Sequence, residues 1–226
     1  TTNPDNPIEG QLWYNTTDNV AKYQIPNVLS SWSTTTSLNT ARRQMAQSGA
    51  GTSSAGLAFG GATGPSATGA TEYYNGTNWT ELSDLNTARR LLGGAGSAYT
   101  AAIGISGSAP PPITANVETF DGSSWTEVAN VNTARSNLAA SGTQTAALAF
   151  GGTADPPTYA LTETWNGSSW TETADLNTAR EDLAGAGATN TEALAIGGFT
   201  GPASPSIVAS NESWNGSAWT EVADLN

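Results

Sequence analysis

The 226-residue chain contains no cysteine and no histidine, and only 12% of its residues are charged. Without cysteine there can be no disulfide framework and no thiolate chemistry. Without histidine the commonest general base and the commonest transition-metal ligand are missing. These absences argue against most nucleophilic and metal-dependent enzymes, and we expect no catalytic residue, no cofactor and no metal site.

Positive charge is also scarce. Lysine and arginine together number 7 against 19 acidic residues, which gives a net charge of −12. A nucleic-acid partner would require a basic stripe that displaces phosphate counterions, and an anionic membrane surface would require a basic cluster. No apolar run approaches the roughly 20 residues of a membrane-spanning helix, and no signal peptide is visible. The sequence therefore predicts no nucleic-acid partner and no membrane insertion.

What the sequence has in abundance is repetition. The segment WTETADLNTAR at 170–180 recurs, with small changes, at 79–89 and 125–135. A degraded copy occupies 32–42, and 219–226 holds the first part of another. We call this repeat the Trp-to-Arg segment. Its copies are 45 to 49 residues apart, and such a period indicates one supersecondary unit copied in tandem.

Each unit reads as four short strands. In the unit 134–176 these are 138–142, 146–150, 161–165 and 169–173, and none shows helical periodicity. The last two strands flank an Asn-Gly pair, which predicts a hairpin with a type I′ turn. Equivalent pairs are Asn75-Gly76, Asn166-Gly167 and Asn215-Gly216, with Asp121-Gly122 as a variant. Four antiparallel strands per repeat predict an all-β fold, a β-propeller.

The first strand of each unit is rich in glycine and alanine, as at 92–96, 138–142 and 183–187. Strands nearest a propeller axis crowd one another, and small residues let their backbones approach. We therefore expect these segments to be the inner strands. Glycine-rich loops are the alternative.

Three further features recur in a fixed order. A double glycine ends the second strand, an aromatic residue lies on the third, and a tryptophan lies on the fourth. The residues are Gly60-Gly61, Gly151-Gly152 and Gly197-Gly198, then Tyr74, Phe120, Trp165 and Trp214, with the tryptophans of the Trp-to-Arg segments. Over nearly the whole chain this combination resembles Kelch-type repeats. The second full unit departs from it, with Ile105-Ser106-Gly107 in place of the double glycine.

The repeated motifs are also similar to those of a narrower group of proteins. LNTAR combined with ALAFGG, after the opening stretch 9–17, resembles Kelch-like structural proteins of bacteriophages, notably marine phages. In such proteins a stretch like 9–17 often opens a tail-fibre or appendage segment. This resemblance implies a place in the virion more than a mechanism.

The repeats divide the chain into blades of a single domain, 1–226. Residues 1–10 are a lead-in, 11–38 a partial blade without its innermost strand, and the full blades are 41–85, 88–131, 134–176 and 179–225. This division predicts a Kelch-like β-propeller of five blades with an incomplete first blade. The alternative is a four-bladed ring preceded by an N-terminal hairpin.

The repeated arginines and tryptophans are interpreted as structural. Each arginine could hold an anion at one mouth of a channel, but a repeated ion pair with Glu81, Asp84 and their counterparts in the other units explains it better. Each tryptophan could stack on sugars, but filling the space between blades is the commoner role. The residues are Arg42, Arg89, Arg135, Arg180, Trp32, Trp79, Trp125, Trp170 and Trp219.

The loops after the second strand differ between units, at 62–70, 108–116, 153–160 and 199–209. In a propeller they emerge on the same side as the Trp-to-Arg connections, and variable loops on a rigid scaffold commonly carry recognition. The candidate ligand contacts are Pro111, Asp155, Tyr159, Phe199 and Ile207. Solvent-exposed loops without a partner are the alternative.

These inferences point to a non-enzymatic structural protein of an extracellular virion. We expect a tail-fibre or appendage propeller that contacts other virion subunits, forms a homo-oligomer and recognises a host-surface glycan or protein by multivalent binding. The alternatives are a purely structural subunit that self-assembles or decorates a particle, and a bacterial adhesin at the cell surface or secreted.

Overall fold

The computed structural model describes residues 12–15, 20–23, 35–52, 54–109, 112–154, 156–201 and 207–225. The chain divides into two compact units, Thr1–Thr35 and Thr36–Asn226. In the first, β1 (Leu12–Asn15) and β2 (Val20–Tyr23) form an antiparallel hairpin, where the sequence predicts the second and third strands of a partial blade. The remaining positions of that predicted blade, up to residue 34, lie outside the described residues.

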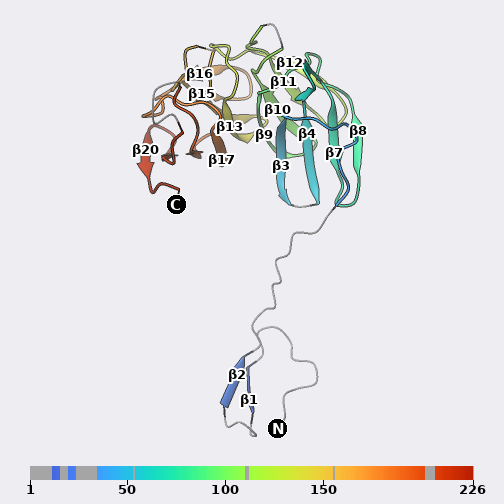
Figure 1. Ribbon diagram of the computed structural model, residues 1–226, viewed down its shortest axis with the longest axis vertical. Helices are drawn as coiled ribbons and strands as arrows, with labels where there is room; N and C mark the ends of the chain where they lie inside the picture. The colour runs from blue at the N-terminus through green and yellow to red at the C-terminus, as the bar shows by residue number, and fades with distance from the viewer. Residues whose placement is uncertain are drawn as a thin grey trace. The chain divides into compact units, whose positions relative to one another are not determined.

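The second unit consists of four antiparallel four-stranded sheets, which confirms the all-β prediction (Figure 1). The first sheet contains β3 (Ala46–Thr52), β4 (Ala55–Phe59), β7 (Thr71–Tyr74) and β8 (Trp79–Leu82). The second contains β9 (Gly93–Ala98), β10 (Ala101–Ile105), β11 (Val117–Phe120) and β12 (Trp125–Val128). The third contains β13 (Ala139–Thr143), β14 (Ala146–Phe150), β15 (Thr162–Trp165) and β16 (Trp170–Glu172). The fourth contains β17 (Ala184–Thr189), β18 (Glu192–Ile196), β19 (Asn211–Trp214) and β20 (Trp219–Val222).

Within each sheet the strands are in sequence order, so each pairs with the next strand of the same sheet. A short hairpin of β5 (Ala62–Thr63) and β6 (Ser66–Ala67) follows the second strand of the first sheet. No helix long and apolar enough to cross a membrane occurs in the part of the chain that the structure describes. The sheets are compatible with propeller blades.

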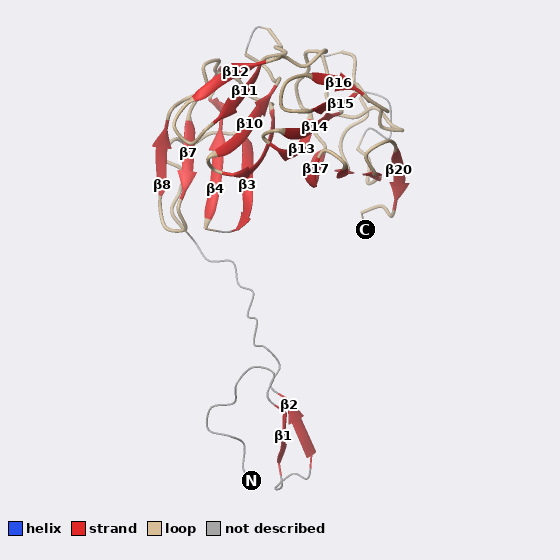
Figure 2. Ribbon diagram, turned by 180° about the vertical axis from the view of Figure 1, so that it is seen from behind, coloured by secondary structure: helices blue, strands red, loops and turns tan. Residues whose placement is uncertain are grey.

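The glycine- and alanine-rich segments form the inner strands, as predicted. Strand β3 contacts β9, β9 contacts β13, and β13 contacts β17, so the four sheets follow one another side by side (Figures 1 and 2). All four inner strands line one small hollow of about 200 Å³. These contacts run in series from the first sheet to the fourth and are compatible with either blade count. Five blades and four blades therefore both stay predictions.

The Asn-Gly pairs do mark the hairpins, but the predicted turn type is wrong. A type I′ turn needs positive φ at both central residues. In the first sheet Tyr74 pairs with Trp79, which leaves a four-residue loop, and only Gly76 in it has positive φ, at 93°. The Asn75 side-chain oxygen instead accepts the amide N–H groups of Thr77 and Asn78, at 2.9 and 2.8 Å. This Asx-type turn replaces the expected mirror-image turn.

The unit that lacks a double glycine keeps the same backbone. Ser106 and Gly107 have φ of 56° and 106°, close to the 65° and 106° of Gly60 and Gly61. Positive φ is unfavourable for serine. Its hydroxyl, however, lies 2.7 Å from the carbonyl oxygen of Arg135 and 3.0 Å from the Arg135 amide nitrogen. These contacts link the second sheet to the segment that enters the third.

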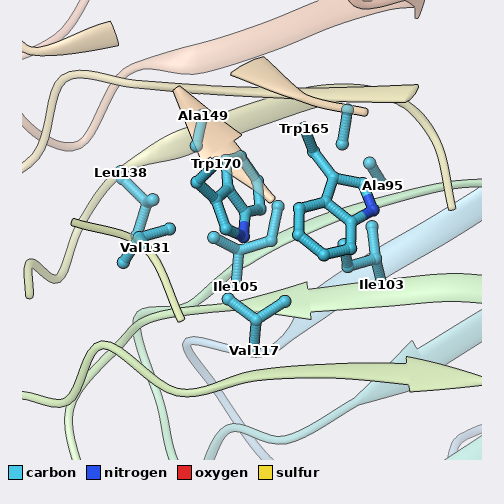
Figure 3. Packing of buried hydrophobic residues seen from close by; sticks show 10 residues of the cluster. Ala95, Ile103, Ile105, Val117, Val131, Leu138, Ala149, Trp165 and Trp170 are labelled. Atoms are coloured by element: carbon cyan, nitrogen blue, oxygen red, sulfur yellow. The ribbon is translucent and has the colours of Figure 1, made fainter. Parts of the chain in front are cut away.

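The hydrophobic core lies between successive sheets. Phe59 of the first sheet packs on Trp125 of the second, with ring centroids 4.9 Å apart, and Phe150 of the third packs on Trp219 of the fourth at the same 4.9 Å. Between the second and third sheets Ile105 takes the place of the phenylalanine (Figure 3). Each sheet thus presents its second strand to the tryptophan of the next.

We call each of these three contacts between successive sheets a joint. A hydrogen bond accompanies two of the three joints. The indole N–H of Trp125 donates to the Thr71 hydroxyl, and that of Trp219 donates to the Thr162 hydroxyl, both at 3.0 Å. At the joint between the second and third sheets the residue in the threonine position is Val117, and the buried Nε1 of Trp170 has no partner. One joint therefore contains an unsatisfied donor.

We expect Val117→Thr to raise the free energy of unfolding by about 1 kcal/mol, because it gives Trp170 the acceptor that the other joints have. Thr162→Val, the reverse change at an equivalent position, should lower it by about 1–3 kcal/mol. Urea unfolding of the two variants beside the wild type measures both effects. Equal signs for the two changes would contradict this account of the joint.

Candidate functional site

The arginine of each Trp-to-Arg segment is a buried scaffold residue. The side chains of Arg42, Arg89, Arg135 and Arg180 are 0% exposed. Each pairs with a glutamate of the third strand in the sheet that follows: Arg42 with Glu72, Arg89 with Glu118 at 2.9 Å, Arg135 with Glu163 at 3.2 Å, and Arg180 with Glu212 at 2.7 Å. No arginine of this set is open to an anion in solution.

The carboxylates predicted as partners were the wrong ones. Glu81, Glu127, Glu172 and Glu221 of the Trp-to-Arg segments are exposed on the fourth strands, and Asp84 is exposed as well. The true partners are buried, with Glu118 at 0% and Glu163 at 1% exposure. One signal could have identified them: a glutamate precedes the third-strand aromatic by two residues in every unit. A charged residue on a strand that must be buried requires a buried counter-charge.

Each buried glutamate also holds the asparagine of the same segment. Glu118 accepts the Asn86 amide N–H at 2.7 Å and the Asn86 side-chain N–H at 2.9 Å. Glu212 makes the same two contacts with Asn177, at 2.7 and 2.8 Å. The Asn-Thr-Ala-Arg part of the repeat is thus a clasp that closes on one carboxylate.

Arg89 and Arg180 also fix both ends of the variable loops in their units. Arg180 donates to the carbonyl oxygen of Gly197 at 3.0 Å, just before loop 199–209, and to that of Ser210 at 2.6 Å, just after it. Arg89 donates to the carbonyl oxygens of Ser106, just before loop 108–116, and of Asn116, its last residue. The repeated scaffold therefore holds the bases of the segments that differ between units.

Burial and pairing act in opposite directions on these guanidinium groups. Burial lowers the pKa of Arg89, and the neighbouring Glu118 carboxylate raises it. Burial likewise lowers the pKa of Arg135, with Glu163 opposing it. Removing the carboxylate would leave burial uncompensated.

The variable loops gather at one end of the sheets. Each begins with a β-bridge to the residue that follows the repeated arginine: Arg43 to Ala62, Arg90 to Ser108, Ser136 to Thr153, and Glu181 to Phe199. Three of the loops close on themselves through a second bridge, as between Phe199 and Ile207. The loops and the Trp-to-Arg connections thus share one end, and the Asn-Gly hairpins lie at the other.

The predicted contact residues fall into two groups. Ile207 is 81% exposed, while Tyr159 and Phe199 are half-buried at the bases of their loops. Pro111 and Asp155, and the structural candidate Trp32, lie outside the described residues. Among the residues that the structure does describe, no group of three or more acidic side chains is arranged to hold a metal ion.

The repeated tryptophans differ according to their sheet. Trp125, Trp170 and Trp219 are buried at 5%, 7% and 6% exposure, each against the preceding sheet. Trp79, in the first sheet, is half-buried and packs on Tyr74, its neighbour across the hairpin, with ring centroids 5.2 Å apart.

The hairpin end contains one ionisable variant of the asparagine turn. At Asp121 the carboxylate accepts the amide N–H groups of Ser124 and Ser123 and the Ser123 hydroxyl, and these bonds lower its pKa from 3.8 to about 2. The ionised form is therefore favoured in the folded state, and this contribution to stability is present above pH 3.8 and is lost as the pH falls to about 2.

Asp121→Asn should remove this acid-sensitive contribution, because asparagine already makes the same turn in the other three sheets. We expect the melting temperature of the variant to rise relative to that of the wild type as the pH falls from 3.8 to about 2. Thermal unfolding across this pH range measures the difference. Parallel curves for the two proteins would contradict the assignment.

No family model matches the chain, and no curated protein matches it.

Proposed function

We propose that this chain is a Kelch-like propeller in a phage virion, a non-enzymatic component of a tail fibre or appendage that recognises a host-surface glycan or protein. The observation that carries the proposal is the placement of the variable loops. Four loops of different sequence leave one end of four similar sheets, and the buried Arg89 and Arg180 hold the bases of two of these loops. A rigid scaffold with variable loops is a common arrangement for recognition.

The chemistry of the buried residues supports a binding role over a catalytic one. The repeated arginines and the third-strand glutamates, Arg89 with Glu118 and their counterparts, pair with each other inside the sheets. Ile207, in the last of the variable loops, is exposed and can contact a ligand. The proposed place of the chain in a virion rests on the resemblance of its repeated sequence motifs to those of phage Kelch-like proteins.

Binding of the full chain to a glycan array tests the proposal. We expect Ile207→Asp and Tyr159→Ala, separately or together, to lower the affinity for any bound glycan by about tenfold or more. The matched control is Asn78→Ala, an exposed change in the hairpin turn at the opposite end of the first sheet. Binding that survives all loop variants, or that is lost in the control, would contradict a loop-based site.

A second candidate function is a purely structural subunit that assembles with itself. It is favoured by a different observation: the exposed apolar side chains Leu194, Val222 and Leu225 lie on or just after strands of the fourth sheet.

A further inference from the structure

The fourth sheet has an open face that is equivalent to a buried face in each of the other three. At the joints, Leu57, Ile103 and Leu148 of the second strands are 1%, 0% and 0% exposed, whereas their counterpart Leu194 is 39% exposed. Likewise Leu85, Val131 and Leu176 are 5%, 3% and 4% exposed, and their counterpart Leu225 is 55% exposed. Val222, at 41%, adjoins them. We call Leu194, Ile196, Asn211, Val222 and Leu225 the open face.

A buried polar atom on this face lacks its partner. Asn211 occupies the position where Thr71 and Thr162 accept the indole N–H of the next tryptophan. It is only 9% exposed, its amide donates to the Ala223 carbonyl oxygen at 2.7 Å, and its Oδ1 has no hydrogen-bond partner. A buried acceptor without a donor is costly. The open face therefore has an unfilled acceptor where a tryptophan N–H is bound elsewhere in the repeat.

The complementary half of the joint is present at the other end of the series. Tyr74 and Trp79 of the first sheet, which we call the tryptophan face, are half-buried, whereas Trp165 and Trp170 at the same positions of the third sheet are 1% and 7% exposed. Hollows of about 680 and 470 Å³ lie on these two end sheets, one beside Leu194 and Trp214 and the other beside Trp79.

A series of backbone hydrogen bonds between the sheets also ends in complementary groups, one at the first sheet and one at the fourth. The Leu91 amide donates to the Gln44 carbonyl, Asn137 to Leu91, and Asp182 to Asn137, at 2.9, 2.9 and 3.0 Å. Among the described residues, the Asp182 carbonyl at one end of this series and the Gln44 amide at the other take part in no further bond of this kind. The first offers an acceptor and the second a donor, which are the two groups that one more step of the series would join.

We infer that the open face of one molecule binds the tryptophan face of a second copy of this chain, head to tail. Trp79 of the second copy would donate its indole N–H to Asn211 Oδ1, and its Gln44 amide would donate to the Asp182 carbonyl. The contact repeats a joint that the chain already makes three times, so its shape and chemistry are established within one molecule. Because the two faces differ, the contact is heterologous, and two copies can close a ring through two such joints.

Light scattering after size exclusion, on the full chain, tests the inference. We expect twice the 23.0 kDa of one chain, and 23.0 kDa for Leu194→Glu, for Val222→Glu and for Trp79→Glu. The matched control is Ile207→Glu, an equally drastic change at an exposed apolar residue off both faces, and it should keep the double mass. Circular dichroism checks that each variant is folded.

A mixing experiment distinguishes this contact from a symmetric one. Leu194→Glu retains an intact tryptophan face, and Trp79→Glu retains an intact open face, so an equimolar mixture should associate although each variant alone does not. A measured mass of 23.0 kDa for the wild type at all concentrations overturns the inference. This outcome includes the case in which another part of the same chain covers the open face. A mixture that stays monomeric also overturns the inference. Both outcomes leave the loop-based binding test unaffected.

Discussion

Glu118→Ala is expected to lower the free energy of unfolding by about 3–5 kcal/mol, since it leaves the buried Arg89 guanidinium without its counter-charge. The pair is 0% exposed on both sides, with 2.9 Å between Arg89 Nη2 and Glu118 Oε1. The same carboxylate accepts two hydrogen bonds from Asn86, so its removal also opens the clasp at the start of the second sheet. Chemical unfolding followed by tryptophan fluorescence measures the loss.

The matched control is Glu127→Ala. Glu127 lies opposite Glu118 in the same sheet, but it is exposed, and its replacement should change stability by no more than about 0.5 kcal/mol. Replacing Arg89 together with Glu118 by apolar residues should recover part of the loss, because no uncompensated charge then remains. If Glu118→Ala and Glu127→Ala have equal effects, the clasp does not hold the fold together.

Phe150→Ala is expected to cost about 3–5 kcal/mol, because it opens a cavity in a joint between two sheets. Phe150 is 0% exposed and packs on Trp219 of the following sheet. In a repeat protein each unit depends on its neighbour, so the loss should also uncouple the fourth sheet from the third. We expect a broader unfolding transition in the variant, with part of the signal lost at lower denaturant concentration.

Ile207→Ala is the control for this change, since it also removes a large apolar side chain but from a residue that is 81% exposed. Its effect should be within about 0.5 kcal/mol, with an unchanged transition width. A single sharp transition for Phe150→Ala, with little loss of stability, would mean that the sheets do not depend on the tryptophan joint.

The strands and their order could be predicted because both follow from local pattern. The Asn-Gly pairs mark each hairpin, and the 45-to-49-residue period separates one sheet from the next. The small residues of β9, β13 and β17 identified the inner strands for a steric reason that needs no knowledge of the rest of the fold.

The partner of each arginine follows less directly, because it depends on which repeated glutamate is buried. Glu81, shortly before Arg89, and Glu118, on a later strand, are both acidic strand residues, and only the fold decides which of them is buried. In the structure Glu118 and Glu127 lie opposite each other on neighbouring strands, yet one is buried and the other is exposed. The turn type was missed for a related reason: the side chain of Asn75 binds the loop amides and permits a four-residue loop.

The open face was beyond prediction because it is defined by a difference between equivalent residues. Leu148 and Leu194 hold the same place in the repeat, and the sequence treats them alike. Their exposures of 0% and 39% differ because a following sheet covers one and none of the described residues covers the other.

Amide hydrogen exchange of the full chain tests most directly the claim that a repeated joint connects the sheets. The account predicts slow exchange for the amides of Leu91, Asn137 and Asp182, which donate across successive sheets. It predicts fast exchange for the Gln44 amide in dilute protein, and slower exchange as rising concentration brings in a second copy. Exchange at Leu91, Asn137 and Asp182 as fast as at the exposed hairpin residue Gly76 would contradict it.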